Sequence, residues 1–182
     1  MENYRLSKWT YDTSASVSIG LGVAAISGGL ISLKDPNRKA HHFHYGGFGV
    51  GASAGFSLTK IKLPEAFIRN YAASGSGSTT DFPGSSVLYM TDSFHGHELA
   101  MSDIQGVAAY VEVGAGSVAS ASGTLMFLGL NPLLIMAAVA SPGFAHLVTI
   151  AIQQAPAVLF MWGASVAPQV GGGINALLGQ LH

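Results

Sequence analysis

The sequence predicts an α+β protein, with an antiparallel β-sheet or small barrel from about residue 14 to 123 and an apolar helical segment from about residue 132 to 181. Long segments in the first two thirds alternate between apolar and small residues, as half-buried strands do. The last third loses this alternation and is apolar on nearly all sides. The 8 Lys and Arg and the 9 Asp and Glu residues all lie between Glu2 and Glu112, so residues 113–182 carry no charge.

The composition excludes several classes of protein. Charged residues make up 9% of the 182 residues, about a third of the share in a typical soluble domain, and the mean hydropathy is +0.42. Such a chain is too apolar for intrinsic disorder, and its scattered cations form no basic stripe for nucleic acid. The absence of cysteine excludes disulfide scaffolds and thiolate zinc sites. The N-terminus lacks an apolar segment behind a basic start, so we expect no secretory signal peptide.

The first strand is expected over residues 14–33, since apolar and small residues alternate from Ser14 onward. Asp35-Pro36-Asn37-Arg38 then predicts a hairpin turn, because proline presets the dihedral angle that a turn needs. The return strand is expected over residues 48–58, where one face is apolar and the other carries only glycine and serine. Together these segments indicate a hairpin with one apolar and one small face.

The middle of the chain is less regular. Residues 72–86 are rich in glycine and serine and are expected to form a loop or linker. A short strand is predicted at Val87–Met90, and a more polar stretch follows from Asp92 to Asp103. Alternation resumes over residues 107–113, and the small residues from 114 to 123 predict a further strand or strand pair.

Two or three helices are expected near the C-terminus. Leu133–Ala140 and Phe144–Ala167 are apolar on nearly all sides. The second segment exceeds the about 20 residues that span hydrocarbon, but Gln153-Gln154 and Pro156 interrupt it. A buried helical hairpin and a transmembrane span both remain open.

No catalytic constellation is expected in the chain. We expect residues 1–123 to form a glycine- and serine-rich antiparallel β region and residues 124–182 a charge-free, apolar helical region, with both parts in one compact domain. No G-x-S-x-G elbow is followed by an acid and a base, and no acidic residue follows Ser117. No glycine-rich segment ends in Gly-Lys-Ser/Thr, as a phosphate loop does. We therefore predict that the protein is not an enzyme and uses no cofactor.

Small residues recur at intervals of four. The series are Gly47, Gly51 and Gly55, a doubled G-x-x-x-G, and a looser set at Gly20, Ala24 and Gly28. In a membrane such small faces let backbones approach closely and pack. The spacing suits a strand and a helix alike, so a sheet whose glycine face is covered by a closely packed helix remains the alternative.

Histidines form two clusters that could bind a metal ion. The candidate ligands are His42, His44, His95 and His97. A His-x-His pair on a strand places both rings on one face, but no cysteine and no third cluster completes a site. Solvated turn histidines are therefore the favoured interpretation, and no metal is assigned.

The charge-free C-terminal third, the absence of a signal peptide and the zipper of Gly47, Gly51 and Gly55 resemble the small glycine-zipper, pore-forming antibacterial effectors of the bacterial type VI secretion system. This resemblance implies synthesis in the cytoplasm, export by that machine with a secretion-tube carrier protein, and action at the recipient's inner membrane. It also implies insertion into the lipid bilayer, homo-oligomers there, loss of ion gradients, and a cognate membrane immunity protein. The side chains expected to insert are Phe144, Leu147, Ile150, Leu159, Phe160 and Trp162.

Two questions stay open at the level of sequence. A pore could be lined by the two-faced strands, with apolar residues toward lipid and small ones toward a lumen, or by the C-terminal helices. The alternative function is a soluble, lipocalin-like barrel that binds an apolar ligand, with the helices as a lid.

Overall fold

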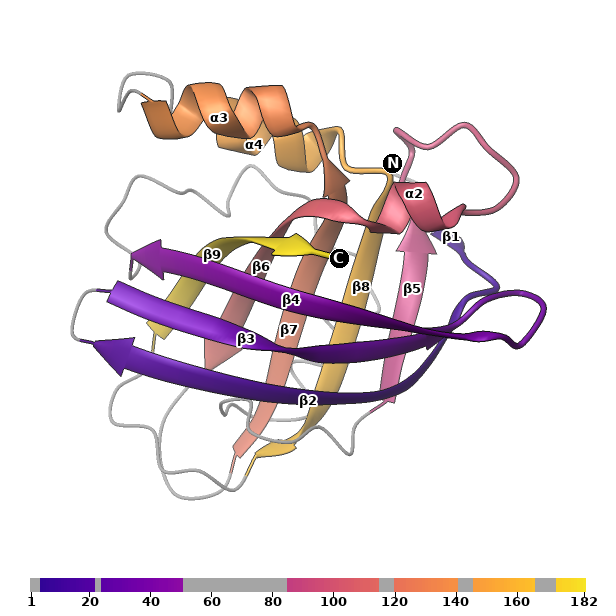
Figure 1. Ribbon diagram of the computed structural model, residues 1–182, viewed down its shortest axis with the longest axis horizontal. Coiled ribbons are helices and arrows are strands. Elements are labelled where there is room, and N and C mark those ends of the chain that lie inside the picture. The colour runs from indigo at the N-terminus through magenta and orange to yellow at the C-terminus, as the bar shows by residue number, and fades with distance from the viewer. Residues whose placement is uncertain (1–3, 22–23, 51–84, 115–119, 141–145, 166–172) are drawn as a thin grey trace.

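The computed structural model describes residues 4–21, 24–50, 85–114, 120–140, 146–165 and 173–182, and these are mostly β-strands (Figure 1). In chain order the elements are β1 (Arg5–Leu6), β2 (Thr10–Leu21), β3 (Ala24–Lys34), β4 (Ala40–Val50), β5 (Ser85–Met90), α2 (Met101–Ile104), β6 (Gly106–Gly114), β7 (Ser120–Leu130), α3 (Pro132–Ala140), α4 (His146–Gln153), β8 (Ala157–Ser165) and β9 (Gly173–Leu181).

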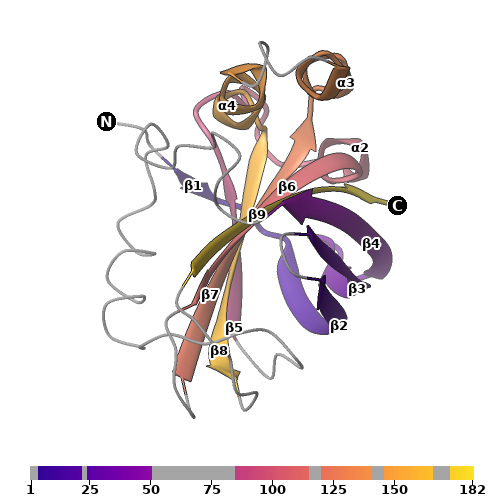
Figure 2. The same cartoon turned by 90° about the vertical axis from the view of Figure 1, so that its left-hand side faces the viewer.

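All nine strands belong to one antiparallel sheet, in the order β1-β5-β8-β7-β6-β9-β4-β3-β2. The sheet curls into a half-barrel, so that β2, β3 and β4 cross over the strands β5, β7 and β8 (Figures 1 and 2). Helices α3 and α4 lie side by side at one end of the half-barrel.

The chain connection between β1 and β2 forces this curl. Only residues 7–9 separate the two strands, although they stand at opposite ends of the sheet. In a flat nine-stranded sheet, eight inter-strand steps of about 4.8 Å would set them roughly 38 Å apart. The four residue steps from Leu6 to Thr10 reach at most about 14 Å. The two edges of the sheet therefore have to meet, and β2 lies against β5.

A set of hydrogen bonds around Glu98 holds this corner. The Ser7 hydroxyl donates to Glu98 Oε1 at 2.6 Å, and the Lys8 N–H donates to Oε2 at 2.9 Å. The N–H of Leu99 also donates to Oε1, at 3.0 Å. The buried indole of Trp9 donates from Nε1 to the Leu99 carbonyl at 2.9 Å. The N-terminal segment is thus fixed to a loop about 90 residues further along the chain.

The Glu98 carboxylate is stabilised in its ionised form. Partial burial raises the pKa of Glu98, but the three hydrogen bonds that its oxygens accept outweigh that effect, so the pKa lies below its ordinary value of 4.5. A folded-state pKa below the unfolded one stabilises the fold above pH 4.5, and this contribution is lost as the pH falls through the folded-state pKa.

Two hydrophobic clusters lie on opposite faces of the sheet. The inner cluster fills the concave side and comprises Trp9, Ile31, Leu33, Phe43, Leu88, Met90, Leu99, Ile104, Ala108, Met126, Leu128, Ala157, Leu159, Met161 and Leu181. The outer cluster, under α3 and α4, comprises Ala109, Leu125, Phe127, Leu130, Ile135, Ala151, Ile152, Ala155, Val158 and Phe160. We call the corresponding sides of the sheet the inner face and the outer face.

The predicted α+β class, with an apolar helical segment to residue 181, is wrong. The helices α3 and α4 are short, and residues 157–165 and 173–181 form the strands β8 and β9 instead. In β8, Leu159 packs in the inner cluster and Phe160 in the outer one. A strand buried on both faces is apolar throughout, so it shows no period of two and cannot be told from a buried helix by pattern.

The N-terminal strands also differ in part from the prediction. Residues 14–33 form two strands, because the chain reverses between Leu21 and Ala24, which pair with one another. The predicted hairpin turn at residues 35–38 is confirmed, since β3 and β4 pair from Lys34 and Ala40 onward. The return strand begins at Ala40, earlier than predicted, and residues 51–58 of the predicted strand lie outside the described residues.

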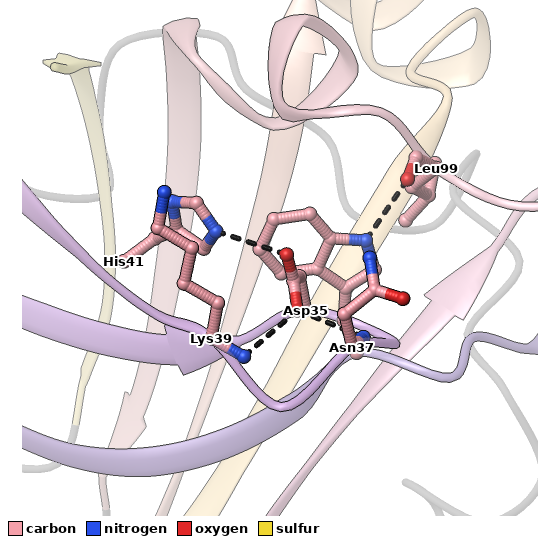
Figure 3. Close-up of polar contacts among 6 residues, drawn as sticks. Asp35, Asn37, Lys39, His41 and Leu99 are labelled. Carbon is pink, nitrogen blue, oxygen red and sulfur yellow. Dashed lines mark hydrogen bonds and ion pairs between the residues drawn. The ribbon is translucent and has the colours of Figure 1, made fainter.

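The Asp35 side chain organises the β3–β4 turn (Figure 3). Its Oδ1 accepts the backbone N–H groups of Asn37 and Lys39 at 2.8 and 2.9 Å, and its Oδ2 lies 3.2 Å from His41 Nε2. The hydrogen bond from the Lys39 N–H is the largest influence on this carboxyl and lowers the pKa of Asp35. An ionised Asp35 therefore supports the turn.

Gly129 is required where β7 passes α2. Its φ is +66°, a left-handed conformation that side-chain-bearing residues rarely adopt. A Cβ at this position would lie 2.3 Å from the carbonyl oxygen of Asp103 and 2.8 Å from Cγ of Pro156. The glycine thus permits a close approach of backbone to backbone.

We expect Gly129→Ala to lower the free energy of unfolding by at least about 2 kcal/mol, from the left-handed strain and the backbone clash together. Urea unfolding followed by tryptophan fluorescence measures this. The control is Gly46→Ala, where a Cβ meets no atom within 4 Å. Equal stability of the two variants would contradict the close approach.

Replacing Glu98 tests the corner. Glu98→Gln replaces one carboxylate oxygen, which accepts a hydrogen bond, with an NH₂ group, which cannot accept one. We therefore expect the free energy of unfolding to fall by roughly 1 kcal/mol at pH 7. The difference from wild type should shrink as the pH falls below 4.5 and through the lower folded-state pKa of Glu98, because the wild-type carboxylate then becomes protonated.

The control for this experiment is Asp12→Asn, which removes the exposed ion pair of Asp12 with Lys34. It should change stability by no more than about 0.5 kcal/mol at either pH. A Glu98→Gln defect that is as large at pH 3 as at pH 7 would show that the carboxylate charge is not what holds the corner.

Candidate functional site

The two faces of the half-barrel differ in residue size in the part of the sheet that extends beyond most of the inner cluster. One row across β2, β3, β4, β9 and β6 contains only small residues: Ser18, Ser27, Gly47, Gly179 and Ala108. The adjacent row is mainly large and apolar: Ile19, Ile26, Phe48, Leu178 and Ala109. Successive strand positions alternate between faces. Ala108 belongs to the inner cluster and Ala109 to the outer one, so the small row lies on the inner face.

The other half of the sheet repeats this arrangement. An inner-face row across β9, β6, β7, β8 and β5 consists of Asn175, Glu112, Thr124, Met161 and Ser86. Its outer-face neighbour consists of Ala176, Val111, Leu125, Phe160 and Val87. Two further pairs, Ser122 with Gly163 and Ser120 with Ser165, extend the inner face. Apart from Met161 of the inner cluster and the pair of Tyr110 with Leu177, the inner-face positions in this part of the sheet are small or polar, and the outer-face rows are apolar.

Only part of the predicted glycine series falls within the described residues. Gly47 lies in the small row of β4, whereas Gly51 and Gly55 lie outside the described residues. In the looser series, Gly20 lies in β2 and pairs with Ala25, on the inner face. Ala24 and Gly28 lie in β3, at alternate positions on the outer face. The chain reversal thus separates Gly20 from its two expected companions.

The predicted membrane-insertion residues lie in several environments. Leu147 and Ile150 are half-buried in α4. Leu159 and Phe160 are buried on opposite faces of β8. Trp162 also belongs to β8, in register with Gly123, and Phe144 lies outside the described residues. These side chains therefore do not form one surface.

The helices and histidines that the structure describes add no further site of the predicted kinds. Among these residues no helix is both long and apolar enough to cross a bilayer. His42 and His44 are exposed on β4, and His95 and His97 are exposed in the loop before α2. In the described ranges no three His, Cys, Asp or Glu residues are grouped closely enough to hold a metal ion.

Two features of the structure had no counterpart in the sequence-based prediction. The rows across strands depend on register, which a single strand's pattern does not reveal, although the alternation of small and apolar residues was visible in each strand. The Glu98 corner joins residues about 90 positions apart. Only the isolated polarity of residues 92–103 in an otherwise apolar chain signalled it.

Comparison with known proteins finds a relative that is similar along nearly the whole chain. The chain is 34% identical to the toxin protein Tse4 of Pseudomonas aeruginosa, over 182 aligned residues that cover 96% of this chain and 93% of that protein. No protein-family model matches the chain. The alignment thus covers nearly the whole chain.

Proposed function

The chain belongs to the family of the toxin protein Tse4, and from this we propose that it is an antibacterial toxin that forms an ion-conducting pore in the target cell's cytoplasmic membrane. The observation that carries the proposal is the pairing of small inner-face rows with apolar outer-face rows. The inner face supplies the lumen, the outer face meets lipid, and no residue acts as a catalyst.

Membrane-embedded strands need this distribution of residues. A strand in a bilayer places apolar side chains toward the lipid and small or polar ones toward a water-filled interior. The row Ile19, Ile26, Phe48 and Leu178 meets the first requirement, and the row Ser18, Ser27, Gly47 and Gly179 meets the second. A sheet that only encloses an apolar core would carry the opposite distribution along its whole length.

Small inner-face residues also create space for a lumen. Without the two-residue β1, the sheet has eight strands, and a barrel of eight strands is about wide enough to be filled by its own side chains. Glycine and serine side chains occupy little of that volume, and Glu112, Thr124 and Asn175 provide polar positions on the same face. The inner cluster occupies the other end, so conduction requires its side chains to be displaced.

Other parts of the proposed function concern delivery and protection. We place the protein among type VI secretion effectors, made in the cytoplasm and exported with a carrier protein from the secretion tube. A producing cell would then need a membrane immunity protein against its own toxin. Homo-oligomers in the membrane are part of the same proposal, because strands of several copies can share one pore.

Conductance across a planar bilayer tests pore formation directly. We expect the purified protein to give discrete current steps, and Gly47→Leu to reduce the conductance at least about tenfold, because a large side chain then enters the lumen. The matched control is Gly46→Leu, one residue away on the outer face, where the structure leaves open space. This variant should conduct like wild type.

The outcomes separate the proposal from its alternative. Equal conductance of Gly47→Leu and Gly46→Leu would show that the inner face does not line the lumen. Silence of the wild-type protein at all voltages would favour a module that binds an apolar ligand, which the half-barrel shape also suits. Mass spectrometry of the purified protein would then show a co-purifying ligand.

A further inference from the structure

Helix α3 exposes large apolar side chains on one side. Leu133, Met136 and Val139 are 73%, 67% and 62% exposed, respectively. Their spacing of three residues places them on one side of the helix. We call these three residues the α3 outer side. Figures 1 and 2 show α3 at the periphery of the molecule, at one end of the half-barrel.

The opposite side of α3 already provides its attachment to the fold. Ile135 and Ala138 are buried, and Ile135 packs in the outer cluster with residues of α4 and the sheet. A surface helix normally carries polar residues on the side away from its core. All nine residues of α3 are apolar, so its outer side is apolar as well. The packing of α3 against the rest of the chain does not require this.

We propose that the α3 outer side is the surface by which the toxin first binds a lipid bilayer, with the helix lying in the plane of the membrane interface. This inference rests on the proposed function in one respect, that the protein acts at a membrane. It assigns the first contact to a helix that is separate from the strands proposed to line the pore.

The chemistry of the helix favours lipid over a protein partner. Protein interfaces contain about one hydrogen bond per 100–200 Å² and are anchored by Tyr, Trp or Arg. Apart from the weakly accepting thioether sulfur of Met136, no side chain from Pro132 to Ala140 can donate or accept a hydrogen bond, and none is aromatic or charged. Residues 113–182 contain no Asp, Glu, Lys or Arg, so none of these charged side chains opposes burial of this part of the chain in an uncharged medium.

The start of α3 is also prepared for an apolar medium. The first N–H groups of a helix normally need water or a cap. Here Pro132 has no N–H, and the N–H of Leu133 donates to Asn131 Oδ1 at 3.0 Å. The N–H of Ile135 donates to the Asn131 carbonyl at 3.3 Å. These donors would keep their partners if water were replaced by lipid, which removes a cost that bare N–H groups impose.

The length of α3 defines how it can lie. Nine residues extend about 14 Å, roughly half of the about 30 Å of hydrocarbon in a bilayer. Exposed polar residues stand just before α3, at Asn131, and at the start of α4, at His146. A helix lying flat keeps such groups at the level of the lipid headgroups while its apolar side enters the acyl boundary.

Flotation of the full-length protein with phosphatidylcholine vesicles tests this assignment. We expect Met136→Glu to weaken vesicle binding about tenfold or more, because a charge replaces an apolar side chain that enters the membrane. Wild-type binding should persist in 0.5 M salt, since the surface carries no charge to be screened. Urea unfolding should show unchanged stability, because Met136 is mostly exposed.

The matched control is Leu6→Glu, which makes the same change at a leucine that is 66% exposed. Leu6 lies in β1, away from α3 in both views of the molecule (Figures 1 and 2). This variant should bind vesicles like wild type. Equal binding of Met136→Glu and wild type, or an equal loss in both variants, would overturn the assignment.

Two further measurements keep this inference distinct from the proposed function. If the wild-type protein binds vesicles but gives no conductance, the membrane-binding role of α3 is supported and the proposed pore is contradicted. The wild-type protein could instead self-associate in light scattering without binding vesicles, and Met136→Glu could abolish that self-association. This result would show that the α3 outer side binds a second copy of the chain, and it would overturn the lipid proposal.

Discussion

The three-residue connection between β1 and β2 is the constraint on which the architecture depends. It joins the two ends of a nine-stranded sheet, so the sheet has to close on itself and acquires an inside and an outside. The Glu98 carboxylate completes this corner by accepting hydrogen bonds from the connecting residues Ser7 and Lys8. The inner cluster, the position of the small rows and the placement of the helices all follow from a sheet that is curled at this point.

The sequence predicted those parts of the fold in which one face of a strand differs from the other. The alternation along β2 to β4 and the Asp35 turn were readable because side-chain period and turn chemistry are local. The pattern of β8 suits a helix as well as a strand, because Leu159 and Phe160 are both buried, on opposite faces. Burial on both sides removes the period that identifies a strand, and only tertiary packing restores the distinction.

The candidate site was predictable in its residue types but not in its arrangement. Glycine and serine alternating with apolar residues indicated a two-faced sheet, whereas the interval of four residues suggested a single zipper. The reversal between Leu21 and Ala24 places Gly20 and Gly28 on different strands, and cross-strand register is what assembles the small row at Gly47. In α3 the uniform apolar composition concealed which side faces the protein, since no polar residue marks the exposed side.

The Glu98 corner also has a consequence for the order in which the chain folds. The hairpins β2–β3 and β3–β4 pair neighbouring segments, so they close short loops and can form early. Ser7 and Glu98 are 91 residues apart, and bringing them together carries the entropic cost of a long loop. We therefore expect the corner to form after these two hairpins, because its partners are far apart along the chain.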